Sequence, residues 1–90
     1  MRDRFEIVFT RGARRALEAE LPESVAAAVF TFITGALRDN PHRVGKPLRE
    51  PLNPLYAARR GDYRVIYRIQ EQRLVIEVVS IRHRRDAYRR

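Results

Sequence analysis

Residues 55–81 read LYAARRGDYRVIYRIQEQRLVIEVVSI. Apolar and polar residues alternate over much of this stretch, and two polar segments, Gly61-Asp62 and residues 70–73, interrupt it. A period of two is typical of half-buried strands, and a Gly-Asp pair is typical of the tight turn between two strands. The stretch therefore predicts an antiparallel meander of three strands, at 55–60, 63–69 and 74–81.

The second turn also predicts which side chains share a face. If that turn is symmetric, Gln70 lies opposite Arg73, and alternate residues of the two strands face the same way. One predicted face is apolar and suits a cover of helices; it holds Tyr63, Val65, Tyr67, Ile69, Leu74, Ile76, Val78 and Ser80. The opposite face is half polar and holds Arg64, Ile66, Arg68, Val75, Glu77, Val79 and Ile81. Its arginines make it a candidate nucleic-acid surface.

The residues before the meander predict a strand and two helices. Residues 4–9 alternate, so they predict a strand that joins the same sheet. Thr10 is a suitable N-cap for a helix over 11–20, and Pro22 suits the start of a second helix that runs to about Arg38. Both helices have apolar residues at spacings of three and four. Residues 40–54 hold four of the five prolines, which predicts a loop.

These elements predict a single α+β domain over residues 1–90. An N-terminal strand and a helical hairpin precede the meander, and the helices cover one face of one sheet. No apolar run approaches the roughly 20 residues that cross a bilayer, so we expect no membrane partner. The absence of cysteine fits a reducing cytoplasm, where we expect the protein to be. The chain has no cysteine, and His42 and His83 have no ligand spacing around them, so neither a metal nor a cofactor is expected.

The charge of the chain points to a polyanionic partner. There are 19 basic residues against 11 acidic ones, a net charge of +8, and Lys46 is the only lysine. Arginine has a planar fork of donors that matches phosphate and a flat face that stacks on bases. Nucleic acid and an acidic protein both fit this excess of positive charge.

Arg64 and Arg82 are the centre of the predicted site. They should lie within two or three residues of each other across the last hairpin, and a basic loop with Arg43, Lys46 and Arg49 could rim the same place. Fixed cations around a phosphodiester stabilise the negative charge that develops during in-line attack. No metal is needed if the nucleophile is the neighbouring 2′-hydroxyl, and such a site selects RNA over DNA.

Other residues near the C-terminus have two interpretations each. His83 could exchange a proton near neutral pH, or it could be an exposed histidine at a strand end. Tyr88 could stack on a base or pack the tail onto the domain. Arg84 and Arg85 more simply supply diffuse affinity for phosphates, and Arg59 and Arg60 could do the same or flank a turn.

Three segments, VGKPL at 44–48, AARRGDYRVIY at 57–67 and HRRDAY at 83–88, resemble the RelE branch of the RelE/ParE toxin superfamily. The resemblance implies a four-stranded antiparallel sheet with a helical hairpin. It also implies an endoribonuclease that cuts mRNA in the ribosomal A site, inhibits translation, and is held inactive by a cognate RelB-like antitoxin.

The resemblance also implies a role for individual residues. Arg64 takes the position of an arginine that holds the scissile phosphate, and Arg82 that of a general acid or charge stabiliser. Tyr88 matches a tyrosine that stacks on the substrate base, and His83 a histidine that some members use in acid–base catalysis. Lys46 and Arg49 approximate a basic loop that carries lysines in the best-known member. The general base stays open, because an arginine remains charged at neutral pH.

Three other functions stay open. The ParE branch shares the fold and inhibits DNA gyrase, but it usually lacks the arginine, histidine and tyrosine cluster. A non-catalytic module would use the arginines only to bind nucleic acid. A small acid–base enzyme for another anionic substrate is a third alternative.

Overall fold

The structure is a computed structural model that describes residues 5–83 and 85. The helical elements are α1 (Arg11–Arg15) with its π-helical continuation η1 (Ala16–Glu20), α2 (Glu23–Phe32) with η2 (Ile33–Leu37), α3 (Pro41–Val44) and the 3-10 turn η3 (Glu71–Arg73). The strands are β1 (Glu6–Phe9), β2 (Lys46–Pro47), β3 (Tyr56–Arg60), β4 (Tyr63–Gln70) and β5 (Val75–His83).

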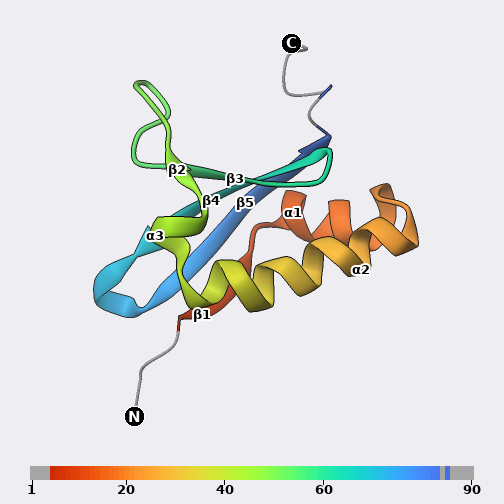
Figure 1. Cartoon of the computed structure of the whole chain (residues 1–90), viewed down its shortest axis with the longest axis horizontal. Helices are drawn as coiled ribbons and strands as arrows, with labels where there is room; N and C mark the ends of the chain where they lie inside the picture. The colour runs from red at the N-terminus through yellow and green to blue at the C-terminus, as the bar shows by residue number, and fades with distance from the viewer. Residues whose placement is uncertain (1–4, 84, 86–90) are drawn as a thin grey trace.

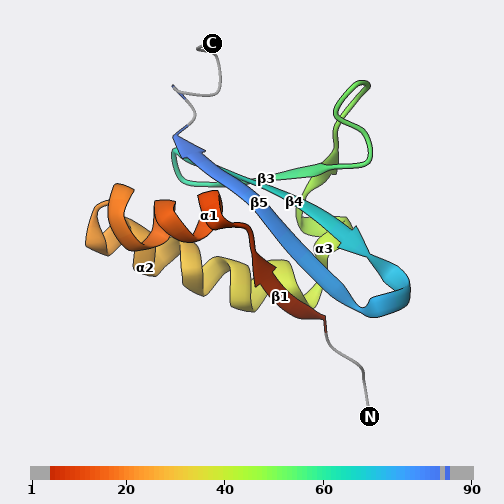
Figure 2. The same ribbon diagram turned by 180° about the vertical axis from the view of Figure 1, so that it is seen from behind.

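The strands form one five-stranded sheet in the order β1-β5-β4-β3-β2. The helical hairpin lies on one side of the sheet, and β1 runs beside β5 (Figures 1 and 2). The predicted α+β fold, with a helical hairpin and a meander in one sheet, is confirmed. The implied four-stranded antiparallel sheet is corrected in two respects: β2 adds a fifth strand, and β1 is parallel to β5. A parallel pair is possible because a long connection returns the chain in the same direction.

The prediction of a loop over 40–54 is wrong at its start. Asn40 precedes α3, and Pro41 takes the first helical position, where the missing N–H of proline costs nothing. Pro47 lies on the edge strand β2, which tolerates proline because one side of an edge strand needs no partner. Residues 48–55 remain a loop, and it rises on the side of the sheet away from the helices (Figure 1).

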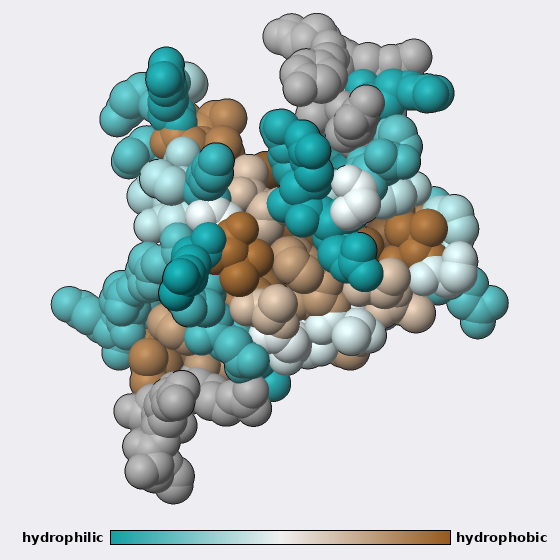
Figure 3. Space-filling model, in the orientation of Figure 1, coloured by the Kyte–Doolittle hydropathy of each residue, from teal (hydrophilic) through white to brown (hydrophobic). Residues whose placement is uncertain are grey.

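The core lies between the sheet and the second helix. Val65, Tyr67, Ile76 and Val78 are fully buried from the sheet, and Val29, Ile33 and Leu37 are buried from α2 and η2. Tyr67 is the largest of these, and its hydroxyl donates a hydrogen bond of 2.6 Å to the Pro41 carbonyl. That bond satisfies a polar atom that would otherwise cost free energy in the core. Apolar surface follows α2, while the surface of the 48–55 loop is mostly hydrophilic (Figure 3).

A β-bulge in β5 changes the predicted faces. Tyr67 lies opposite Val78 but Ile66 lies opposite Ser80, so Val79 is an extra residue. The predicted faces are correct up to Val78 and wrong beyond it: Ile81 belongs to the core at 6% exposure, and Ser80 faces away from the helices. One inserted residue moves every later residue of the strand to the other face of the sheet. The alternation of residues in the sequence does not reveal where the insertion lies.

Candidate functional site

Three arginines lie side by side on the sheet face turned away from the helices, here called the open face. Arg59 of β3 lies directly opposite Arg64 of β4, and Arg64 lies directly opposite Arg82 of β5. The next row along the strands, which includes Val65 and Ile81, points into the core, so these three point the other way. We call Arg59, Arg64 and Arg82 the arginine row. The expected proximity of Arg64 and Arg82 is confirmed, and they are closer than the two or three residues expected.

The arginine row is electrostatically unfavourable in the protein alone. Directly opposite residues in an antiparallel pair have Cα atoms about 4.5–5.5 Å apart, and like charges there are destabilising. Within residues 5–83 and 85, none of the three guanidinium groups has an acidic partner. Arg68, two residues after Ile66 on the same face, is different because it pairs with Glu77 at 3.7 Å. The row therefore offers three uncompensated cations to an anion from outside.

A fourth cation lies in the next row of the open face. Lys46 lies opposite Ala57, and Ala57 lies opposite Ile66, so the lysine is on the face that carries the arginine row. The loop that carries Arg49 rises on the same side of the sheet (Figure 1). The structure thus brings Lys46, and the loop of Arg49, to the side of the sheet where the sequence predicted a basic rim.

Two predicted RNA-binding residues lie elsewhere. Arg60 follows Arg59 and therefore points to the opposite face, where it lies beside Ala27 and Ala28 of α2. Arg43 belongs to α3, which packs on the helix-covered face through the hydrogen bond between Tyr67 and Pro41. The structure does not bring either arginine to the row.

His83 also lies on the other face. It is opposite Tyr63, and their rings meet edge to face with centroids 5.0 Å apart. The Nδ1 atom of His83 accepts a hydrogen bond of 3.0 Å from the backbone N–H of Arg85, which is exposed. The bulge separates His83 from the arginine row, because it places Arg82 on the open face and turns the next residue away. Tyr88 and Arg84 lie outside the described residues.

Thr10 holds the bulge that places Arg82. Its hydroxyl donates to the Val79 carbonyl at 2.7 Å, and its backbone N–H donates to the Val78 carbonyl at 3.0 Å. The same hydroxyl accepts the Ala13 N–H at 3.2 Å, which confirms the predicted N-cap. The cap was predictable from the residues around Thr10, but the contact with the strand, 69 residues away in the chain, was not.

In the core, burial, helped by the neighbouring Tyr56, raises the pKa of Tyr67 to about 12. Residues 5–83 and 85 contain no cluster of three or more side chains suited to a metal ion. None of the helices in this part of the chain is both long and apolar enough to span a membrane.

Comparison with known proteins agrees with this fold. Residues 7–88 match the family model described as the ParE toxin of the type II toxin–antitoxin system parDE. Toxin RelE of Mycobacterium tuberculosis is 46% identical over 94% of this chain and 87% of that toxin. Toxin RelG of the same organism is 44% identical over 96% of this chain and 98% of that toxin.

Solved structures give the same result. A chain of the toxin–antitoxin complex RelBE2 from M. tuberculosis superposes with a TM-score of 0.85 and 41% identity, covering 90% of this chain and 99% of that one. The archaeal RelE–RelB complex from Pyrococcus horikoshii gives a TM-score of 0.68 and 26% identity, covering 89% and 94% of the two chains. These matches define a toxin of a type II toxin–antitoxin system. The chain belongs to the RelE/ParE superfamily, and within it to the RelE family.

Proposed function

We propose that this toxin is a ribosome-dependent endoribonuclease that cuts mRNA and so inhibits translation in the cytoplasm. Arg64 and Arg82 hold the scissile phosphate and stabilise the charge that develops on it, and Arg59 and Lys46 extend this grip along the RNA. The 2′-hydroxyl on the 5′ side of the scissile phosphate loses its proton and attacks the phosphorus, and the bond from phosphorus to the 5′-oxygen of the next nucleotide breaks. The products are a 2′,3′-cyclic phosphate and a 5′-hydroxyl that has taken up a proton, and the step needs no metal.

The observation that carries this proposal is the arginine row. Three uncompensated guanidinium groups on adjacent strands cost folding free energy. A bound phosphodiester offsets the repulsion between these arginines, because arginine and phosphate form strong charge-assisted hydrogen bonds. Cations held by a rigid sheet need little rearrangement when the transition state forms.

The C-terminal residues complete the proposal. Tyr88 stacks on the base beside the cut, and Arg84 and Arg85, with Arg49 of the loop, add affinity for phosphates. His83 remains the candidate for proton transfer. Its ring lies on the face opposite the arginine row, so this role requires the RNA to pass around the end of β5.

An antitoxin is the natural second partner. The related RelBE2 and RelE–RelB structures are toxin–antitoxin complexes. A RelB-like protein with an acidic or amphipathic segment would neutralise the basic open face and would add a strand to the edge of the sheet.

The test is a cell-free translation reaction followed by mapping of mRNA 5′ ends. We expect cuts that require ribosomes, and a rate at least a hundredfold lower for Arg64→Ala or Arg82→Ala. Arg73→Ala is the matched control, because Arg73 is an exposed arginine in η3, beyond the far end of β4. Full activity of both row variants, or fast cleavage of naked RNA at physiological salt, would contradict the proposal.

One finding favours a second candidate, inhibition of DNA gyrase, because the matching family model is the ParE toxin. A supercoiling assay with purified gyrase separates the two functions. Gyrase inhibition without mRNA cleavage would establish the ParE-like function. RNA affinity with neither activity would leave a non-catalytic binding module.

A further inference from the structure

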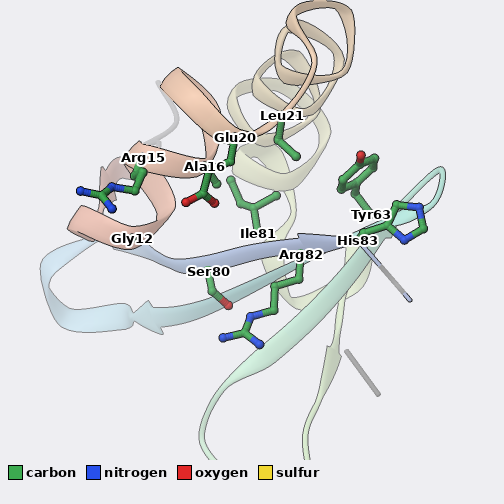
Figure 4. Close-up of a pocket in the computed structure, with 10 residues that line it drawn as sticks. All are labelled: Gly12, Arg15, Ala16, Glu20, Leu21, Tyr63, Ser80, Ile81, Arg82 and His83. Atoms are coloured by element: carbon green, nitrogen blue, oxygen red, sulfur yellow. The ribbon is translucent and has the colours of Figure 1, made fainter. Parts of the chain in front are cut away.

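A groove of about 530 Å³ lies beside the arginine row, on the other side of β5. Its walls are α1 and η1 on one side and the last four residues of β5 on the other (Figure 4). The polar residues that line it are Arg15, Glu20, Tyr63, Ser80, Arg82 and His83.

We propose that this groove binds one nucleotide of the RNA whose neighbouring phosphate is held by the arginine row. The base packs against Tyr63 and His83, and the phosphate lies between Arg15 and Arg82. This inference rests on the proposed function, because the same RNA strand occupies both places.

Arg82 connects the two places. It is opposite Arg64 in the row, and it also lines the groove. Ser80 and Arg82 leave β5 on one side while Ile81 leaves it on the other (Figure 4). An RNA strand that crosses the open face from β3 to β5 therefore meets the groove as soon as it passes the last strand.

The groove has the chemistry of a base-binding site. Tyr63 and His83 form a right-angled pair, with planes at 84°, so a base can stack on one ring while it meets the edge of the other. The nearby Ala16 and Ile81 are almost fully buried, at 3% and 6% exposure, and provide an apolar floor. A volume of 530 Å³ is within the range of roughly 300–1,000 Å³ typical of small-ligand sites.

The polar groups suit the rest of a nucleotide. Arg15 and Arg82 are exposed cations at the walls, and Glu20 can accept from a ribose hydroxyl or an exocyclic amine. The outer edge of β5 also has free hydrogen-bonding capacity. β1 pairs with β5 only as far as Val78, and in the described part of the chain no strand pairs with that edge further on.

The same free edge could accept a peptide strand, but it suits a nucleotide better. It extends only over Ser80–His83, about 13 Å at 3.3 Å per residue. Thr10 blocks its continuation, because it already binds the carbonyls of Val78 and Val79. A strand added there would be short, and it would make no use of the paired aromatic rings.

The experiment is a titration of the full chain, labelled with ¹⁵N, with a 2′-O-methyl RNA tetranucleotide that cannot be cleaved. We expect amide shifts in the arginine row and in the groove together. Arg15→Gln should weaken binding by about threefold to tenfold, as loss of one phosphate contact does. Arg14→Gln is the matched control: Arg14 is the exposed neighbour on the same helix, it lines a different hollow beside Phe30, and its loss should leave the affinity unchanged.

Two further variants test the role of the aromatic ring of Tyr63. Tyr63→Phe should retain the affinity, whereas Tyr63→Leu should reduce it by a factor of about five or more. Circular dichroism and the dispersion of the amide spectrum show whether each variant is folded. Equal affinities for Tyr63→Leu and Tyr63→Phe in folded protein would overturn the assignment of the base.

The outcomes of the titration distinguish a failure of the groove inference from a failure of the proposed nuclease function. Shifts in the row without shifts in the groove would overturn this inference and leave the nuclease proposal intact. No shift in either place would remove the support for both. If an acidic peptide of alternating Glu and Val binds the groove and the RNA does not, the groove is a site for a protein strand and the inference is wrong.

Discussion

Arg64→Gln should make the folded protein more stable while it weakens RNA binding. Arg64 is the middle residue of the arginine row, so its charge faces a like charge on each side. Glutamine keeps part of the aliphatic stem, which matters because Arg64 is half-buried. Removal of the central cation relieves both repulsions at once.

The size of the effect follows from the register. The Cα atoms of opposite residues are about 5 Å apart, and two unit charges at that separation in water would repel by about 0.8 kcal/mol, which salt at 0.15 M roughly halves. Because the guanidinium groups lie at the ends of long side chains that can move apart, two such pairs give an upper limit of about 1.5 kcal/mol for the gain in unfolding free energy at low salt and about 0.8 kcal/mol at physiological salt. For a domain of this size, 1 kcal/mol corresponds to a rise in Tm of about 4–8 °C.

The assay is thermal and urea unfolding at two salt concentrations, with Arg68→Gln as the control. Arg68 is on the same strand and the same face, but it pairs with Glu77. Its replacement should lower the stability by about 0–1 kcal/mol, which is the range for exposed ion pairs. The gain for Arg64→Gln should shrink as salt is added.

Equal destabilisation by the two substitutions would refute this reasoning. It would mean that the guanidinium group of Arg64 has a favourable partner in the folded protein. The row would then be a structural feature, and the case for a phosphate site would lose its main support.

Three further predictions concern the parts of the fold that support the site. Thr10→Val should lower the unfolding free energy by about 1–2 kcal/mol and also weaken RNA binding, because it removes the hydroxyl that caps the helix and binds the bulge at Val79. Thr10→Ser, which keeps the hydroxyl, should retain both properties. Gly45→Ala should lower the unfolding free energy, measured in urea, by about 2–4 kcal/mol, because its methyl carbon would lie 2.1 Å from the Tyr67 hydroxyl. Adding Tyr67→Phe should restore part of this stability. Burial raises the pKa of Tyr67 to about 12, above its value near 10 in the unfolded chain, so the contribution of its neutral hydroxyl to stability should be fully present below pH 10 and be lost as the pH rises from 10 to 12. The fall in unfolding free energy over this range should be smaller in Tyr67→Phe.

The sequence alone predicted most of the elements and the right fold class. Period-two alternation over 55–81 gave the meander, and spacings of three and four before Arg38 gave the helical hairpin. These predictions succeed because the patterns are local: each depends only on which residues of one segment must leave water. The excess of arginine also predicts an anionic partner, which depends on composition and not on the fold, and this stays a prediction.

The sequence did not predict α3, β2 or the bulge at Val79. Pro41 and Pro47 look like loop residues, but one starts a helix and the other lies on a sheet edge, where the missing N–H is tolerated. The bulge depends on Thr10, which is far away in the chain. Contacts of this kind do not appear in any local pattern.

For the site, the sequence determined which residues carry charge, and the tertiary structure decided which of them meet. Arg59 and Arg60 are neighbours in the chain, yet only Arg59 joins Arg64, because adjacent residues of a strand point to opposite faces. Arg82 and His83 are separated in the same way, and the bulge decides which of the two lies on the open face. The proposed grip on phosphate is therefore encoded in residue types, but the geometry of the arginine row exists only once β3, β4 and β5 have paired in this register.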